Sequence, residues 1–172
     1  MCVCASINTH IRNCIVIQSK VLSQVTFPHN NLLYWLSTEG WASFQGSCYL
    51  LSTTTTVWQQ AEDQCRSSGG HLLVLNNAEE LHPQIKASIV DIKYSYWIGL
   101  VERQHEGHWS WVDGTDFGST PTFWDQGQPD NWDFRVNGED CGQLHASVNR
   151  KRKLWNDADC SLGYRYICEA KA

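Results

Sequence analysis

The sequence lacks the signatures of the common enzyme classes. It contains no HExxH zinc motif, no phosphate-binding loop and no dinucleotide fingerprint, and no Ser, Cys or Lys stands in a recognisable nucleophile motif. The apolar stretch at 11–21 is interrupted by polar and charged residues, so it falls far short of the ~20 apolar residues that a membrane-spanning helix requires. A formal net charge of −5 disfavours a nucleic-acid partner selected by bulk electrostatics. These absences favour a binding domain without catalytic machinery.

Cysteine and tryptophan are abundant instead. The chain has 8 Cys and 9 Trp among 172 residues. Eight cysteines without a CxxC…CxxC or CxxC…HxxxH spacing indicate disulfides in an oxidising compartment rather than a zinc site. The tryptophans indicate large apolar faces to bury or ligand rings to stack. The length fits one domain that buries about two thirds of its unfolded surface.

The chain divides near residue 37. Residues 1–36 show few charges and no clear periodicity, and we interpret them as an atypical segment, either a stalk remnant or a gene-model artefact, before a domain at 37–172. The start has no basic region, apolar core and small-residue cleavage site in succession. Because the cysteines need oxidation, we expect an extracellular protein. It is either secreted or the ectodomain of a membrane receptor whose anchor is absent from this chain.

Local patterns after Trp41 predict alternating strands and helices. Strands are expected at 41–51, 71–75, 96–100, 109–112, around 155 and at 164–168, and helices at 58–65 and 78–90. The threonines at 53–56 offer hydroxyls to cap the first helix. The stretch at 113–137 is rich in Gly, Asp, Asn, Pro and Thr without either periodicity, and a loop of that length in a compact domain is usually functional.

Oxygen-bearing side chains gather in and after this loop. Hard cations such as calcium take six to eight oxygen ligands at about 2.3–2.6 Å. Suitable oxygens come from the carboxylates of Asp130, Glu139 and Asp157 and from the amides of Gln128 and Asn156. A cation held in this way is both a charge centre and a ring of hydrogen-bond partners that a sugar diol can bridge. The flanking cysteines and tryptophans make a plain solvated acidic loop the weaker interpretation.

The order of these motifs resembles that of C-type lectin domains. The motifs run from Trp41 to Glu169: Trp41…Phe44…Cys48-Tyr49, Trp58…Ala61…Cys65…Gly70-His71-Leu72, Trp97-Ile98-Gly99-Leu100, Gln128-Pro129-Asp130, Glu139-Asp140-Cys141, Trp155-Asn156-Asp157 and Cys168-Glu169. The resemblance implies an α+β, C-type lectin-like fold with two helices, small antiparallel sheets and a long calcium-binding loop. It also implies two disulfides, Cys65–Cys168 and Cys141–Cys160.

The resemblance further implies two calcium sites. The ligands of the primary site are Gln128, Asp130, Glu139, Asn156 and Asp157, with a cis peptide bond before Pro129 and with Asp157 binding through side chain and backbone carbonyl. The ligands of a possible second site are Glu102, Glu106, Asn131 and Asp140. The second match is weaker, because Glu102 and Asn131 stand where many members carry aspartate.

The Gln-Pro-Asp order resembles the galactose-type subgroup, including receptors of liver and macrophages, whereas Glu-Pro-Asn goes with mannose-like sugars. Exchanging acid and amide reverses the hydrogen-bond polarity that two vicinal hydroxyls meet. Trp132 then offers its face to the apolar side of galactose; the alternative is that it anchors the core. Residues 133–138 contain one glycine where those receptors have a glycine-rich run, so weaker affinity or broader preference is expected.

The function expected from the sequence is that of a calcium-dependent lectin. The five primary ligands and Trp132 would bind galactose- or N-acetylgalactosamine-bearing glycans or glycoproteins, without nucleic acid and without membrane contact by this domain. The rival is a domain of the same fold that binds a protein ligand without sugar. Such members typically lose primary-site ligands, and all five are present here. Glycoside hydrolysis is disfavoured because Asp130, Glu139 and Asp157 would all bind the ion, which leaves no carboxyl group free to act as the general acid. Homo-oligomerisation stays open.

Three further features of the sequence have more than one interpretation. Cys48 can pair with Cys2, Cys4 or Cys14, link two chains or stay free. The basic run at 150–153 is either a solvated loop or a contact for sulfate or sialate on a longer glycan; a nuclear-localisation signal conflicts with the disulfides. The two neighbouring histidines, at 105 and 108, are expected to be surface hairpin residues rather than metal ligands.

Overall fold

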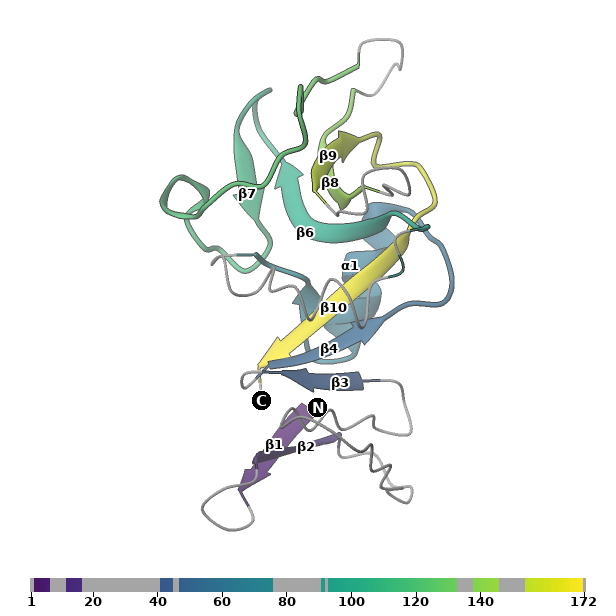
Figure 1. Cartoon of the computed structure of the whole chain (residues 1–172), viewed down its shortest axis with the longest axis vertical. Helices are drawn as coiled ribbons and strands as arrows, with labels where there is room; N and C mark the ends of the chain where they lie inside the picture. Colours follow the sequence, from purple (N-terminus) through teal and green to yellow (C-terminus); the bar gives the residue numbers. More distant parts are fainter. Residues whose placement is uncertain are drawn as a thin grey trace.

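The computed structural model shows helix α1 (Trp58–Ser67) packed on a mixed sheet, with a long loop above the sheet (Figure 1). It describes residues 2–6, 12–16, 41–44, 47–75, 91, 93–132, 138–145 and 154–171. The second helix expected at 78–90, the residues at 133–137 and the basic run at 150–153 lie outside the described residues. In the part that is described, no helix is long and apolar enough to cross a membrane.

The main sheet has eight strands, with β3, β4, β10, β6, β8 and β9 in that order, β5 paired to β10 and β7 to β6. Small antiparallel sheets were expected, but the parallel pairing of β10 with β6 joins them into one sheet. The other strand pairs of this sheet are antiparallel. The elements are β3 (Trp41–Phe44), β4 (Ser47–Leu51), α1 (Trp58–Ser67), β5 (His71–Leu72), β6 (Tyr96–Glu102), β7 (Trp109–Trp111), the 3-10 helix η1 (Phe117–Ser119), β8 (Cys141–Leu144), β9 (Trp155–Ala158) and β10 (Arg165–Lys171).

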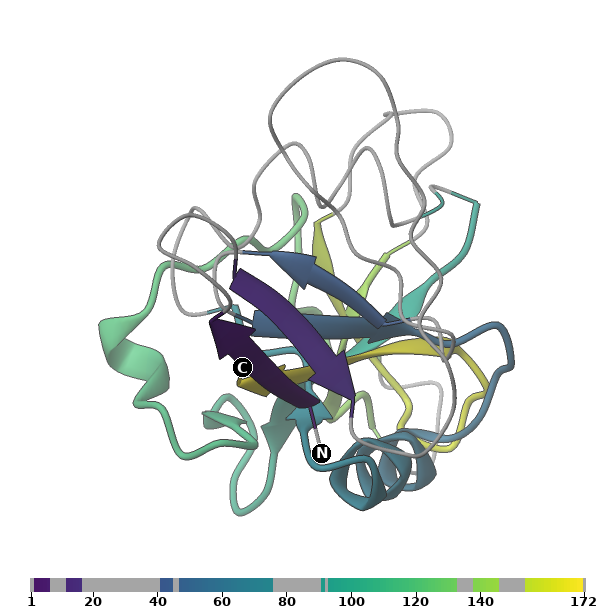
Figure 2. The same ribbon diagram turned by 90° about the horizontal axis from the view of Figure 1, so that it is seen from below.

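A separate hairpin precedes the domain, where the sequence pattern predicted no regular element. Strands β1 (Cys2–Ser6) and β2 (Arg12–Val16) pair antiparallel, with Cys4 opposite Cys14. Seen from below, this hairpin, in purple, lies in front of β3 and β4 and near the C-terminus (Figure 2). Cys48 in β4 is disulfide-bonded, which excludes a free thiol, and its partner lies outside the side chains that the structure describes.

Helix α1 begins without the predicted threonine cap. Its N-cap residue is Val57, which makes no side-chain capping bond. The reason is that Thr56 is held in extended conformation by two backbone hydrogen bonds with Tyr164, of 2.9 and 3.1 Å. The helix ends at a glycine turn, where Gly69 has a φ of 83° that glycine adopts without strain.

Two disulfides attach the outer elements to the sheet, as the family resemblance implied. Cys65–Cys168 joins α1 to β10, and Cys141–Cys160 joins β8 to the turn after β9. Their sequence separations of 103 and 19 residues each restrict the unfolded chain, by about 3–5 kcal/mol in the chain-entropy model. Between the two bridges, the buried indole of Trp58 donates to the carbonyl of Ile98 at 2.8 Å.

Strand β6 separates two apolar clusters by simple alternation. Tyr96, Ile98 and Leu100 face a cluster rich in tryptophan beneath the long loop, whereas Trp97 and Val101 face the helix side. All five side chains are buried, because both faces of the strand are covered. The tryptophan-rich cluster therefore supplies the surface on which the long loop packs through Phe123 and Trp124.

We expect Gly99→Ala to destabilise the fold by about 1–3 kcal/mol, the usual penalty for overpacking a core. A Cβ there would lie 2.6 Å from Cγ2 of Val112 and 2.7 Å from the backbone oxygen of Leu72, which cannot rotate away. Urea denaturation measures the free energy of unfolding. The matched control is Gly163→Ala, whose Cβ would meet no atom closer than 3.8 Å. Equal stabilities of the two variants would contradict the packing argument.

Candidate functional site

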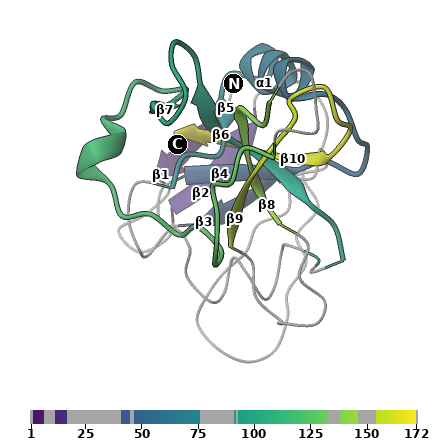
Figure 3. The same cartoon turned by 90° about the horizontal axis from the view of Figure 1, so that it is seen from above.

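The long loop is fixed to strand β9 by backbone hydrogen bonds around Trp155. The amide of Trp155 donates to Phe123 at 2.8 Å, and its carbonyl accepts from Asp125 at 2.8 Å. The buried indole of Trp155 also meets the rings of Phe123 and Trp124 edge-on, each at 5.5 Å. Seen from above, the green loop crosses from η1 to the ends of β8 and β9 (Figure 3). The residues that follow Trp155 in β9 therefore lie directly under the loop.

Three of the predicted primary ligands form one cluster. Carboxylate oxygens of Asp130, Glu139 and Asp157 all lie within 4.8 Å of one another. Backbone amides of the loop hold them: Asp157 accepts from Asp130 at 3.2 Å and from Asn131 at 2.7 Å, and Glu139 accepts from Trp132 at 3.1 Å. Asn131 has a φ of 40°, in the left-handed region. The loop is thus folded around the Asp157 carboxylate.

The two amide ligands of the prediction lie at the edges of this cluster. Asn156 precedes Asp157 in β9, and its side-chain amide contacts the backbone carbonyl of Asp157. Gln128 is joined to Pro129 by a cis peptide bond, as predicted. Its Oε1 is buried and meets no donor among the described residues. A buried acceptor without a donor costs about 1–3 kcal/mol, and a cation is one partner that satisfies it. The donor set therefore fits a hard cation.

A second acidic cluster coincides with the weaker of the two predicted sites. Carboxylate oxygens of Glu102, Glu106 and Asp140 lie within 4.8 Å of one another. The fourth predicted residue, Asn131, lies like Asp140 beside Gly138, where an added Cβ would be 3.0 Å from Oδ1 of Asn131 and 3.3 Å from Oδ1 of Asp140. Its Oδ1 accepts from the Glu139 amide at 3.0 Å, so Asn131 is bonded to the primary cluster.

Burial and like charge oppose ionisation at both clusters. Burial raises the pKa of Asp157, the amides of Asn131 and Asp130 oppose that rise, and the charge of Asp130 adds to it. Burial is also the first cause of the raised pKa values of Glu102 and Asp140. The charges of Asp140 and Asp157 add to the raised pKa of Glu102, so the two clusters repel each other. Such repulsion is what a divalent cation relieves.

Trp132 does not anchor the core. Its side chain is 56% exposed, beside the primary cluster to which its backbone amide donates. The large ring is therefore available on the surface next to the carboxylates. His105 and His108 are exposed residues of the β6–β7 turn, as expected.

Two polar residues of the site escaped the sequence analysis. Asp159 is 6% exposed, accepts from the amide and hydroxyl of Ser161, and contributes to the raised pKa of Asp140. Gln143 lies opposite Asn156 in the β8–β9 ladder, with its buried Oε1 unpaired among the described residues. Strand β8 was not predicted from the sequence, so nothing placed Gln143 opposite Asn156. The one hint in the sequence is that Gln143 follows the predicted disulfide cysteine Cys141 by two residues.

Comparison with known proteins identifies the class of this domain. A profile of the family described as Lectin C-type domain matches residues 54–170, more than half of the chain. The chain therefore belongs to the C-type lectin domain family, whose members are binding proteins rather than enzymes.

Individual relatives agree with that assignment. C-type lectin domain family 4 member E of Mus musculus is 38% identical over 129 residues, which are 75% of this chain and 58% of that protein. Asialoglycoprotein receptor 2 of Mus musculus is 37% identical over 133 residues, which are 76% of this chain and 41% of that protein. The chain thus spans about half the length of these relatives.

A solved structure shares the fold. The human scavenger receptor C-type lectin carbohydrate-recognition domain matches with a TM-score of 0.68 and 34% identity, covering 77% of this chain and 97% of that domain. The C-type lectin-like α+β fold predicted from the motifs is confirmed.

We expect the metal-free protein to become more stable as the pH falls from neutral. Folding raises the pKa values of Asp157, Glu102, Asp140 and the buried Glu169, so the folded state binds more protons than the unfolded chain. This contribution grows as the pH falls through the raised values, and it is complete below the ordinary values of 3.8 for Asp and 4.5 for Glu.

Urea titrations in chelator across this range measure the effect. Asp157→Asn should flatten the pH dependence, whereas Asp63→Asn, on the exposed face of α1, should leave it unchanged. A metal-free protein whose stability instead falls on acidification from neutral would refute the charge repulsion.

Proposed function

We propose that this domain is a calcium-dependent lectin for galactose- or N-acetylgalactosamine-type terminal sugars. The observation that carries the proposal is the primary cluster, in which three carboxylates converge and the buried oxygen of Gln128 has no donor among the described residues. Two kinds of oxygen, carboxylate and amide, are what calcium takes in proteins. A buried Asp157 carboxylate beside two like charges, held in place by backbone amides, is hard to explain as a structural device alone.

The residues of the site suit both tasks of such a lectin, which are to hold calcium and to hydrogen-bond the sugar hydroxyls. Gln128, Asp130, Glu139, Asn156 and Asp157 would hold the primary calcium ion, and Glu102, Glu106, Asn131 and Asp140 a second one. When bound, calcium supplies a positive centre that two neighbouring sugar hydroxyls approach. The carboxylates accept hydrogen bonds from those hydroxyls, and the amide NH₂ groups donate to them. Loop amides keep Asp157 and Glu139 in position before the sugar arrives.

The sugar class follows from the order of acid and amide around Pro129. Gln128 before it and Asp130 after it set the polarity of the hydrogen bonds offered to a diol. The exposed ring of Trp132 lies beside the cluster, where its face can carry the CH groups of galactose. One relative named above is an asialoglycoprotein receptor, and another is a carbohydrate-recognition domain, which supports a glycan ligand.

The setting that fits this role is extracellular. The disulfides of the domain form and persist in an oxidising compartment. Galactose-bearing glycoproteins at cell surfaces or in secretions are then the partners, without nucleic acid and without membrane contact by this domain. Several copies acting together strengthen such binding without any new contact.

The direct test is retention on galactose-agarose and mannose-agarose, each with calcium and with chelator. We expect calcium-dependent retention on galactose alone. Asp130→Ala should abolish retention with an unchanged fold, because Asp130 is exposed and its carboxylate serves only the cluster. The control is Asp91→Ala, an exposed acid outside both clusters. Retention on neither resin by folded wild-type protein would favour a domain that binds a protein ligand.

Sugar preference has its own test. The double variant Gln128→Glu and Asp130→Asn keeps the number of carboxylates and amides but exchanges their positions around Pro129. Its preference should shift from galactose towards mannose, because the hydrogen-bond polarity offered to the diol is reversed. Competition with free methyl galactoside and methyl mannoside measures the ratio of affinities. Unchanged galactose selectivity in a variant that still requires calcium would refute the polarity argument.

A further inference from the structure

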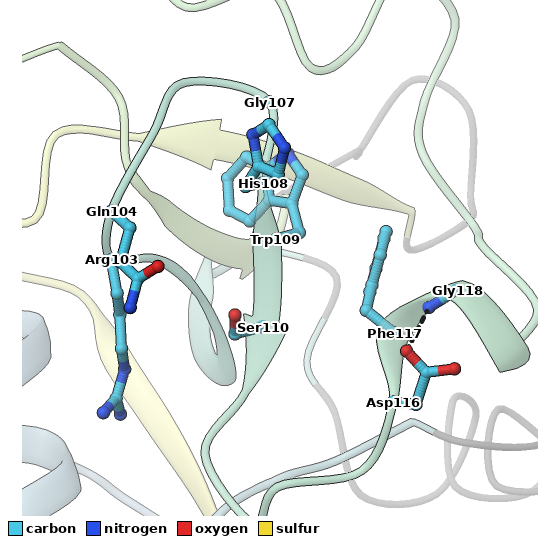
Figure 4. Close-up of a pocket in the computed structure, with 9 residues that line it drawn as sticks. All are labelled: Arg103, Gln104, Gly107, His108, Trp109, Ser110, Asp116, Phe117 and Gly118. Carbon is cyan, nitrogen blue, oxygen red and sulfur yellow. Dashed lines mark hydrogen bonds between the residues drawn. The ribbon is translucent and has the colours of Figure 1, made fainter.

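A hollow lies on the β6–β7 hairpin, and none of the residues assigned to calcium lines it. Its volume is about 400 Å³, within the range of pockets that hold small ligands. Figure 4 shows it between the hairpin and the segment at η1. It is lined by Arg103, Gln104, Gly107, His108, Trp109, Ser110, Asp116, Phe117 and Gly118.

The floor of the hollow contains an unsatisfied donor. Trp109 is only 9% exposed, whereas the residues around it, except Ser110 and Phe117, are exposed. The ring of Trp124 packs against the Trp109 indole at 4.9 Å and fixes it. Nε1 of Trp109 is buried and has no acceptor within the part of the chain that the structure describes. Buried indole N–H groups usually find a partner, so the unpaired Nε1 of Trp109 is an uncommon feature of this floor.

The walls offer both hydrogen-bond polarities. The guanidinium of Arg103 only donates and forms no ion pair with the described residues, while the carboxylate of Asp116 only accepts. One Asp116 oxygen receives a long bond of 3.3 Å from the Gly118 amide, which leaves most of its acceptor capacity unused. Ser110 and Gln104 can both donate and accept. The formal charges of Arg103 and Asp116 cancel, so the hollow selects against a strongly charged ligand.

An aromatic face completes the set. Phe117 is half-buried, and its ring is held by Trp111 at a centroid distance of 6.2 Å. In Figure 4 its side chain stands across the hollow from Trp109 and His108. A pyranose ring has hydroxyls that donate and accept at its rim and CH groups on its face. Those are the groups that this combination of donors, acceptors and an aromatic ring can satisfy together.

We propose that this hollow is a second saccharide subsite, which binds a neutral pyranose residue without calcium. The inference deepens the proposed function and rests on it for the choice of ligand. The hollow and the second acidic cluster share one turn: Glu106 immediately precedes Gly107, whose amide donates to Oε1 of Glu102 at 2.9 Å. An inner sugar of a glycan in the hollow therefore lies next to the calcium-binding region.

The experiment records the indole ¹H–¹⁵N signals of the full chain by NMR in chelator. Trp109→Phe assigns the Trp109 signal. Methyl β-galactoside, methyl α-mannoside and lactose are then titrated into wild-type protein and Asp130→Ala. We expect a saturable shift of the Trp109 signal in both proteins, because the hollow needs neither calcium nor Asp130. No saturable shift with any of the three sugars on folded protein would overturn the proposal.

Variants separate a subsite from a general solvent effect. Asp116→Asn and Phe117→Leu should each weaken the Trp109 response roughly tenfold, as expected for losing a charged acceptor or an aromatic face. Asp113→Asn, an exposed acid of the same loop outside the hollow, should leave it unchanged. Equal responses in all three variants would refute the subsite. The difference in agarose retention between calcium and chelator reports the calcium-dependent site, whereas the Trp109 signal in chelator reports the hollow, so failure of either proposal is visible without the other.

Discussion

The candidate site depends on one buried tryptophan. Trp155 is fully buried and holds the long loop through both its backbone and its ring. Asn156 and Asp157 follow it in β9, so the same strand that anchors the loop also carries its acidic centre. The loop contains no regular element except η1 in its described part, yet its amides point at fixed carboxylates. Rigid core packing therefore replaces secondary structure as the means of positioning.

The electrostatics of the loop run against its stability. Six acidic residues form the two clusters, and several have pKa values raised by burial and by their neighbours. A chain selected for stability alone would spread such charges or pair them with cations. The ion pair between Glu62 and Arg66 lies on α1, away from the clusters. The energetic penalty is thus concentrated where a cation would remove it, which is typical of a binding site.

The sequence allowed much of the fold to be predicted because its motifs are local and chemically specific. The cysteine pairs, the buried β6 strand and the cis bond before Pro129 all appear as expected. The threonine cap failed because Thr56 pairs with Tyr164, a contact between residues far apart in the chain. Strand β8 and the buried Asp159 were missed for the same reason. Their structure comes from long-range pairing, which no window of neighbouring residues records.

The two proposed binding regions differ in the groups that hold their ligands. At the acidic clusters, a cation relieves the repulsion between the carboxylates and supplies a positive centre for a neutral diol. At the hollow beside η1, the formal charges of Arg103 and Asp116 already cancel. Because the β6–β7 turn carries Glu102 and Glu106 on one side and Gly107 and His108 on the other, fixing the clusters also fixes a wall of the hollow. Affinity for a single terminal sugar and selectivity for the longer glycan can then be adjusted by different residues.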